Sequence, residues 1–347
     1  MIKLKDNFKS IKYICLVIFC LCLITVIYNF KIKTRYSEEV VTDYLSVTTS
    51  SMEKENFFYT FEIDNSLIKE QLVIEDTAQY PLGVIDYKNQ KIYYSQRVDG
   101  KDQIFLYDMK NKKAQQLTND FHAINKIYPY QDKLYILAKT VNNPRVSLIE
   151  YDLNKEKYNI LTKKSIQVVT MSHSEENACL FYASYNWDEQ EKLHKEFQET
   201  PEKQPTPLNS RYTIYRLNYI SGIIDKIFET ELLVSNMSVF PNQEKFILRV
   251  SKSLFEPKTI ILYDVINSEI KEINIKNIGA IENISFYKNG FFFTGIKESE
   301  IDLNELGNIS PPNSILYMDL NSNEIKEIMS FEDKYINNFD LFTNNCQ

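Results

Sequence analysis

The chain has 347 residues, a net charge of −7 and 44% hydrophobic residues, and it contains 24 Tyr and 21 Phe but only seven Gly. This apolar content is too high for a disordered protein, and the many aromatic residues favour half-buried strands, so we expect a mostly β fold. Residues 1–36 carry a net charge of +6, which leaves −13 for the rest of the chain and argues against a nucleic-acid partner.

The first 55 residues are expected to attach the protein to a membrane. Residues 1–12 form a short basic tail, which we place in the cytoplasm, and residues 13–30 are an uncharged apolar run long enough for a transmembrane helix. A cleaved signal peptide is the alternative, but the run ends without the small residues that a cleavage site needs. We therefore expect an uncleaved signal-anchor, a linker over residues 31–55, and a single-pass protein of the cell membrane whose main domain lies outside the cytoplasm.

A phrase of one pattern then occurs five times along the chain. Each copy is an apolar and aromatic strand, a polar turn opened by Asp or Asn, and a second strand. Such residues accept hydrogen bonds from turn amides, so we assign them a structural turn role rather than a ring of carboxylates for calcium or acid–base chemistry. The five residues are Asp108, Asp152, Asn218, Asp264 and Asp319.

A second series of tight turns, each followed by an aromatic strand, runs alongside the first. The matching positions lie mostly 42 to 45 residues apart and are Lys91, Lys133, Ala178, Lys245 and Gly290. A unit of about 44 residues with four short strands, a to d, is typical of a β-propeller blade. The predicted fold is therefore an all-β propeller over residues 56–347.

The two ends of the propeller are predicted to share one blade. Residues 56–76 resemble strands c and d, residues 334–345 resemble a strand a, and residues 40–47 are a candidate for strand b. Joining them removes both open edges of the ring, so six blades is the preferred number, with five or seven as alternatives.

The repeated phrase, L-Y-D and L-T separated by eight residues, and the P-N-Q-E-K turn at Pro241–Lys245 resemble the WD40-like repeats of the TolB-type propeller superfamily. The resemblance covers about residues 56–345. It implies a propeller fold but no particular activity, since such propellers include docking modules, ligand binders and enzyme domains.

Motifs of catalysis and metal binding are missing from the sequence. The three histidines, His122, His173 and His194, lack metal-ligand spacing, and no nucleophile elbow or phosphate-binding loop occurs. We expect no metal, no cofactor and no catalytic residue.

Two acidic insertions interrupt the repeat between strands b and c, at residues 186–209 and 298–312. Loops on a rigid scaffold often carry function, so we expect a partner there, with solvated, tolerated loops as the alternative. The candidate binding residues are Trp187, Asp188, Glu189, Glu191, Glu298, Glu300, Asp302 and Glu305.

The function predicted from these features is a membrane-tethered scaffold that binds another protein or a peptide, possibly a cationic one, through its b–c loops. Two alternatives stay open. One is a carbohydrate-active or peptidase-associated enzyme, which requires two acids facing each other across a cleft. The other is a small-ligand sensor that uses the central channel.

Overall fold

The computed structural model describes residues 42–51, 53, 55–75, 81–199, 210–253, 256–301 and 311–343, with the backbone alone for Glu300. The tail expected at residues 1–12 and the membrane helix expected at residues 13–30 lie outside these residues. Within the part described, no helix is both long enough and apolar enough to cross a bilayer.

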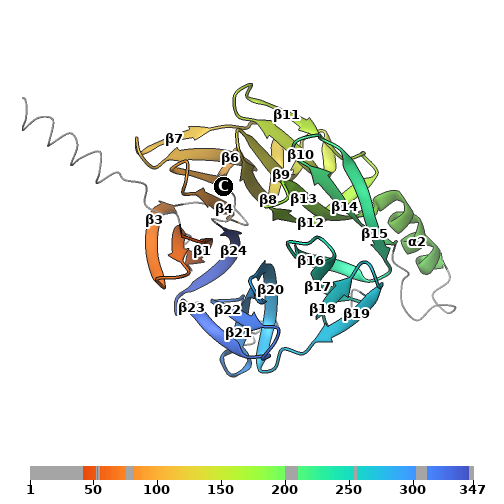
Figure 1. The fold of residues 1–347 in the computed structure, drawn as a ribbon. Coiled ribbons are helices and arrows are strands. Elements are labelled where there is room, and N and C mark those ends of the chain that lie inside the picture. Colours follow the sequence, from red (N-terminus) through yellow and green to blue (C-terminus); the bar gives the residue numbers. More distant parts are fainter. Residues whose placement is uncertain are drawn as a thin grey trace, which may run out of the picture. The chain divides into compact units, whose positions relative to one another are not determined.

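The described chain from Asp43 onward forms six antiparallel sheets of four strands, arranged as blades in a ring (Figure 1). Six blades were predicted, and this prediction is confirmed. The strands are β1 (Tyr44–Ser51), β2 (Glu55–Glu62), β3 (Leu67–Glu75), β4 (Gly83–Asp86), β5 (Lys91–Val98), β6 (Lys101–Asp108), β7 (Lys113–Gln116), β8 (Phe121–Tyr130), β9 (Lys133–Thr140), β10 (Asn143–Asp152), β11 (Lys157–Ile160), β12 (Ile166–Ser174), β13 (Cys179–Asn186), β14 (Tyr212–Asn218), β15 (Ile224–Thr230), β16 (Leu233–Val239), β17 (Lys245–Ser251), β18 (Thr259–Asp264), β19 (Glu269–Ile273), β20 (Ile278–Tyr287), β21 (Gly290–Lys297), β22 (Ser314–Asp319), β23 (Ile325–Ser330) and β24 (Lys334–Phe342).

The closing blade has the strand order β24-β1-β2-β3 and so combines the two ends of the domain. Strand β1 pairs with β2 on one side and with β24 on the other, with Tyr44 opposite Phe342 and Ser51 opposite Lys334. Because β1 lies within residues 31–55, where we expected a linker, the propeller begins near Asp43 rather than at residue 56.

The core lies between neighbouring blades and consists of aromatic and aliphatic side chains. Phe181 of β13 meets Phe246 of β17 edge to face, with ring centroids 5.5 Å apart, and both rings are buried. Met237 and Ile214 complete the same cluster. Each blade therefore stabilises the next through its apolar face.

The five Asp or Asn residues of the repeated phrase end their strands c and close the turns that follow. In each turn one side-chain oxygen accepts the backbone N–H groups two and three residues later, over distances of 2.8 to 3.0 Å. These bonds lower the pKa of Asp108, Asp264 and Asp319, whereas for Asp152 the bond from the Lys155 side chain is the largest cause.

Replacement of Asn218 tests how much these turn bonds stabilise the blade. Its Oδ1 accepts the N–H groups of Ile220 and Ser221 at 3.0 and 2.9 Å. We expect Asn218→Ala to lower the free energy of unfolding by about 1 to 2 kcal/mol, since two amides lose their acceptor. Asn218→Asp, which restores the residue of the sister turns, should stay close to the wild type in urea denaturation. Equal losses in both variants would contradict this role.

Candidate binding face

The turns and loops of the propeller gather on two opposite faces. The N–H of Tyr219 in a c–d turn donates to the carbonyl of Ala178 in an a–b turn, so these turns share one face, here called the turn face. The N–H of Trp187 at the start of a b–c loop donates to the carbonyl of Ser165 in a d–a connection, so these segments share the other face. We call this second face the b–c face, and it carries both acidic insertions.

The first insertion contains a helix that the sequence analysis missed, α2 (Trp187–Glu199). The side chain of Asn186 caps its N-terminus by accepting the N–H groups of Asp188 and Glu189 at 3.0 and 3.3 Å. Ion pairs between residues four apart, Glu191 with Lys195 and Lys192 with Glu196, support it. The sequence signal that could have predicted this helix is an Asn at the N-cap position, followed by acidic residues and strong helix formers.

Two of the predicted site residues fix the start of α2 to the neighbouring blade. The carboxylate of Asp188 pairs with the guanidinium of Arg145 at 2.9 Å, and that guanidinium also lies 5.7 Å from the centre of the Trp187 ring. The indole stacks on Tyr185 and is 37% exposed. Trp187 and Asp188 therefore position the helix as well as facing solvent.

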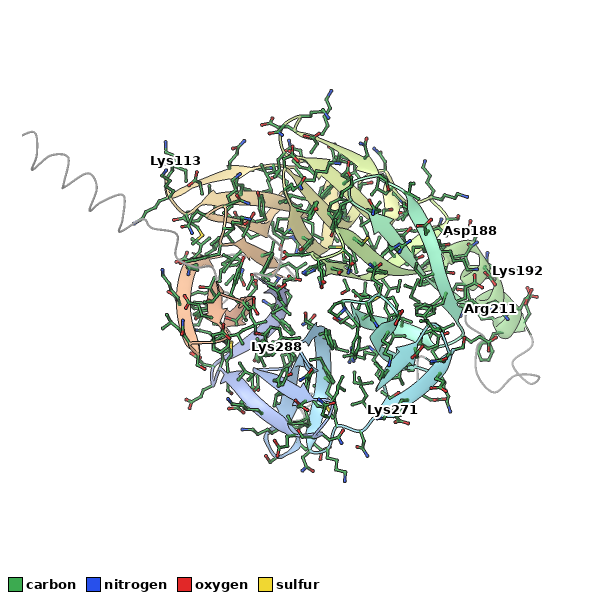
Figure 2. All side chains as sticks on the ribbon, viewed as in Figure 1. Lys113, Asp188, Lys192, Arg211, Lys271 and Lys288 are labelled. Carbon is green, nitrogen blue, oxygen red and sulfur yellow. The ribbon has the colours of Figure 1, made fainter. Side chains whose placement is uncertain are left out.

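The rest of α2 projects from the rim of the ring, where Figure 2 shows Asp188, Lys192 and Arg211. None of its residues is buried, and it carries five carboxylates against two lysines. Glu189 and Glu191 lie on this exposed helix. Glu298 of the second insertion is exposed and begins a short 3₁₀ segment, η2 (Glu298–Glu300). The side chain of Glu300 and the residues Asp302 and Glu305 lie outside what the structure describes.

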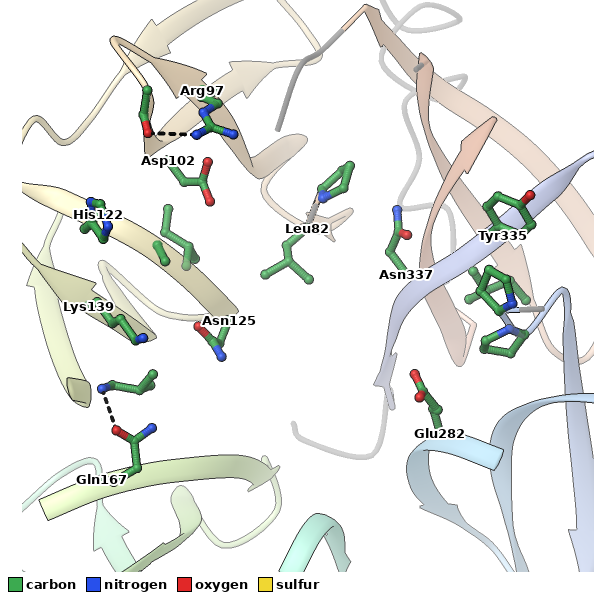
Figure 3. Close-up of a pocket in the computed structure, with 18 residues that line it drawn as sticks. Leu82, Arg97, Asp102, His122, Asn125, Lys139, Gln167, Glu282, Tyr335 and Asn337 are labelled. Carbon is green, nitrogen blue, oxygen red and sulfur yellow. Dashed lines mark hydrogen bonds between the residues drawn. The ribbon is translucent and has the colours of Figure 1, made fainter. Parts of the chain in front are cut away.

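A pocket of about 850 Å³ opens on the b–c face, between the inner strands of the blades (Figure 3). Residues of five blades line it. Pro311 and Pro312 of the second insertion line the pocket. The first insertion lies close to it, because Asp188 pairs with Arg145, and Arg145 directly precedes the lining residue Val146. The polar lining consists of Arg97, Asp102, His122, Asn125, Lys139, Gln167, Glu282, Tyr335 and Asn337.

Irregular pairing of the inner strands accompanies this polar lining. The register of β8 with β9 shifts at His122 and again at Asn125, and the register of β24 with β1 shifts at Asn337. The β20–β21 pair shifts on both sides of Glu282. A β-bulge inserts an extra residue and re-aims its side chain, which explains how these groups come to face the pocket.

Sequence reasoning missed the pocket for the same reason. Its polar residues come from strands far apart in the sequence. The bulges also interrupt the alternation of polar and apolar residues from which the faces of a strand are predicted. The side chains of His122 and Lys139 make no hydrogen bond or ion pair with any other described residue, whereas the Arg97 side chain donates to the carbonyl of Gly100 at 3.1 Å. The pocket thus offers cationic groups, and also the carboxylates of Asp102 and Glu282, which Figure 3 shows on opposite sides.

A second polar cluster lies on the inner strands β8, β12 and β24 and reaches towards the turn face. Lys126 pairs with the buried carboxylate of Asp340 at 3.4 Å, yet burial raises the pKa of Asp340. The Tyr128 hydroxyl donates to Glu175 at 2.9 Å, and His173 stacks on the Tyr128 ring with centroids 3.7 Å apart. Burial raises the pKa of Glu175 and, with a smaller effect of Lys126, lowers the pKa of His173 to about 3.

Metal ligands do not converge anywhere in the described part of the chain, where no group of three His, Cys, Asp or Glu side chains could hold an ion. The described cysteine, Cys179, is buried and burial is the main cause that raises its pKa, so it lacks the features of a reactive thiol.

The fold is similar to several solved structures. A chain of a nidogen/laminin complex matches with a TM-score of 0.55 at 9% identity, over 88% of this chain and 100% of that chain. A protein assigned as TolB from Agrobacterium tumefaciens matches with a TM-score of 0.52 at 10% identity, over 87% of this chain and 99% of that one. TolB from Acinetobacter baumannii matches with a TM-score of 0.47 at 10% identity, over 85% and 67%.

The match to the Agrobacterium tumefaciens protein supports the predicted TolB-like resemblance at the level of the fold. The chain is a six-bladed propeller of four-stranded blades. No family model matches it, and no curated protein matches it. At identities near 10% the likeness concerns architecture alone.

Proposed function

We propose that the protein is a membrane-tethered, extracytoplasmic propeller that binds a protein or a peptide through its b–c face. The observation that carries this proposal is the pocket of about 850 Å³ on the face to which both insertions belong. A partner that lies across this face would contact the insertions with its surface and place one side chain or chain end in the pocket.

Charge supports a cationic partner at the rim. The exposed helix α2 carries a net excess of three carboxylates, so it would attract a basic segment and raise its association rate. Inside the pocket, cationic and anionic groups both occur, since Arg97 and Lys139 lie across from Glu282. The pocket is therefore suited to a zwitterionic or hydrogen-bonding group rather than to a purely basic one.

Selection from a random peptide library, with the full chain as the target, tests this function. We expect peptides that bind the wild type to lose at least about tenfold in affinity for Asn125→Trp, because an indole at this exposed pocket position fills the space. Asn321→Trp, in a c–d turn of the opposite face, is the matched control and should bind normally. Failure to select any peptide, or equal binding by both variants, would contradict the proposal.

A small polar ligand of the channel is the second candidate function. The volume of the pocket falls in the range of small-molecule sites, and Lys139 and His122 are available as hydrogen-bonding groups. Thermal-shift screening with amino acids, sugars and nucleosides distinguishes it, because such a ligand should raise the melting temperature of Asn321→Trp but not that of Asn125→Trp.

A further inference from the structure

The turn face of the propeller carries apolar side chains where turns are normally polar. Ile220 and Ile266 occupy the second position after Asn218 and Asp264 and are 83% and 67% exposed. Ile223 in the same turn as Ile220 is 57% exposed. At the same position the sister turns have polar residues, which are Lys110, Asn154 and Asn321.

These isoleucine turns belong to adjacent blades and lie on one face. The N–H of Val265 donates to the carbonyl of Glu244, which ties the second turn to the a–b turn of its blade. The side chain of Asn177, in an a–b turn of the first blade, donates to the carbonyl of Pro241 in the next blade at 2.6 Å. The exposed isoleucines therefore form an apolar rim on one side of the turn face.

The N-terminal segment enters the propeller at this same face. The Asp43 carbonyl accepts the N–H of Ile63, which begins the c–d turn of the closing blade, at 3.0 Å. The next residue, Tyr44, pairs with Phe342 at the turn-face end of β24. Twelve residues, 31–42, separate this entry point from the apolar run, and they span at most about 40 Å when extended.

We propose that the turn face is the side of the propeller that meets the lipid bilayer, and that Ile220, Ile223 and Ile266 insert into its interfacial region. The proposal shares with the proposed function only the membrane tether at residues 13–30. A short tether attached to this face keeps it near the lipid, where exposed aliphatic side chains gain by leaving water. The b–c face and its pocket then point away from the membrane, towards an incoming partner.

Single-tryptophan variants of the full chain in phosphatidylcholine vesicles test this contact, because Trp187 is the only native tryptophan. In the background Trp187→Phe, we expect Ile220→Trp and Ile266→Trp to lose emission when the lipid acyl chains are brominated. The wild-type chain, whose single tryptophan, Trp187, lies on the opposite b–c face, is the control and should keep its emission.

Each other outcome overturns the proposal in a recognisable way. Suppose that the chain sediments with the vesicles but that the tryptophans at positions 220 and 266 are not quenched. This result would refute lipid contact of the turn face and would still agree with membrane attachment through residues 13–30. A blue-shifted but unquenched emission would assign the rim to a protein contact or to a second copy of this chain. A chain that does not sediment with vesicles would refute the tether too, whereas peptide binding at the b–c face is measured independently.

Discussion

Removal of β24 is expected to abolish cooperative folding of the propeller. Deleting residues 332–347 takes away the inner strand of the closing blade, which pairs with the whole length of β1. It also removes the buried side chains of Ile336, Phe339 and Leu341. At about 2 to 5 kcal/mol for each such side chain, the loss reaches the whole stability of a typical domain, which is about 5 to 15 kcal/mol.

Two milder variants keep this prediction testable by thermal melting followed with circular dichroism. Phe339→Ala should fold but lose about 3 to 5 kcal/mol, since its buried ring leaves a cavity. Deletion of residues 192–207 should change stability by less than about 0.5 kcal/mol, because no residue of α2 is buried. A shortened chain without β24 that still melted cooperatively near the wild-type temperature would show that the ring does not depend on this closure.

Acidification is expected to destabilise the protein through His173. The folded protein keeps this imidazole neutral, with a pKa of about 3 instead of 6.5, because of burial and, less strongly, the nearby Lys126 ammonium. A lowered pKa means that only the unfolded chain takes up the proton as the pH falls below about 6.5. The stability that the neutral His173 contributes is therefore fully present above about pH 6.5 and is lost progressively as the pH falls to about 3. At pH 4 the folded protein has lost about 3 kcal/mol of this contribution.

Urea denaturation of wild type and His173→Gln between pH 7 and pH 4 measures this contribution. The difference in unfolding free energy between the two proteins should change by about 3 kcal/mol over this range. Glu175 and Asp340 act in the opposite direction, since burial raises their pKa and protonation relieves the folded state. Both are present in the variant, so the difference isolates His173. Parallel pH profiles for the two proteins would contradict a buried neutral imidazole.

The blades could be predicted from the sequence because each repeats the same local signals. Strands b begin at Lys91, Lys133, Lys245 and Gly290, at the matched positions of the second series of turns. The shared closing blade also followed from strand-like segments at the two ends. In both cases the information lies in short stretches of residues, where alternation and turn chemistry act locally.

The candidate site was predictable only in part, because it depends on contacts between distant segments. The two interruptions of the repeat located the b–c face, but α2 was taken for a loop. The pocket could not be found, since His122, Asn125 and Asn337 reach it through bulges that no repeat reveals. The pairing of Asp188 with Arg145 likewise joins two blades, 43 positions apart in the sequence.

The most direct test of the proposed function is photo-crosslinking in intact cells from a probe at Asn125 in the pocket, compared with the same probe at Asn321 on the turn face. We predict that one protein or peptide partner is captured from Asn125 and not from Asn321. A second probe at Glu189 on α2 should capture the same partner, because both positions belong to the b–c face. Capture of the same set of proteins from all three positions, or none from Asn125, would contradict binding through the b–c face.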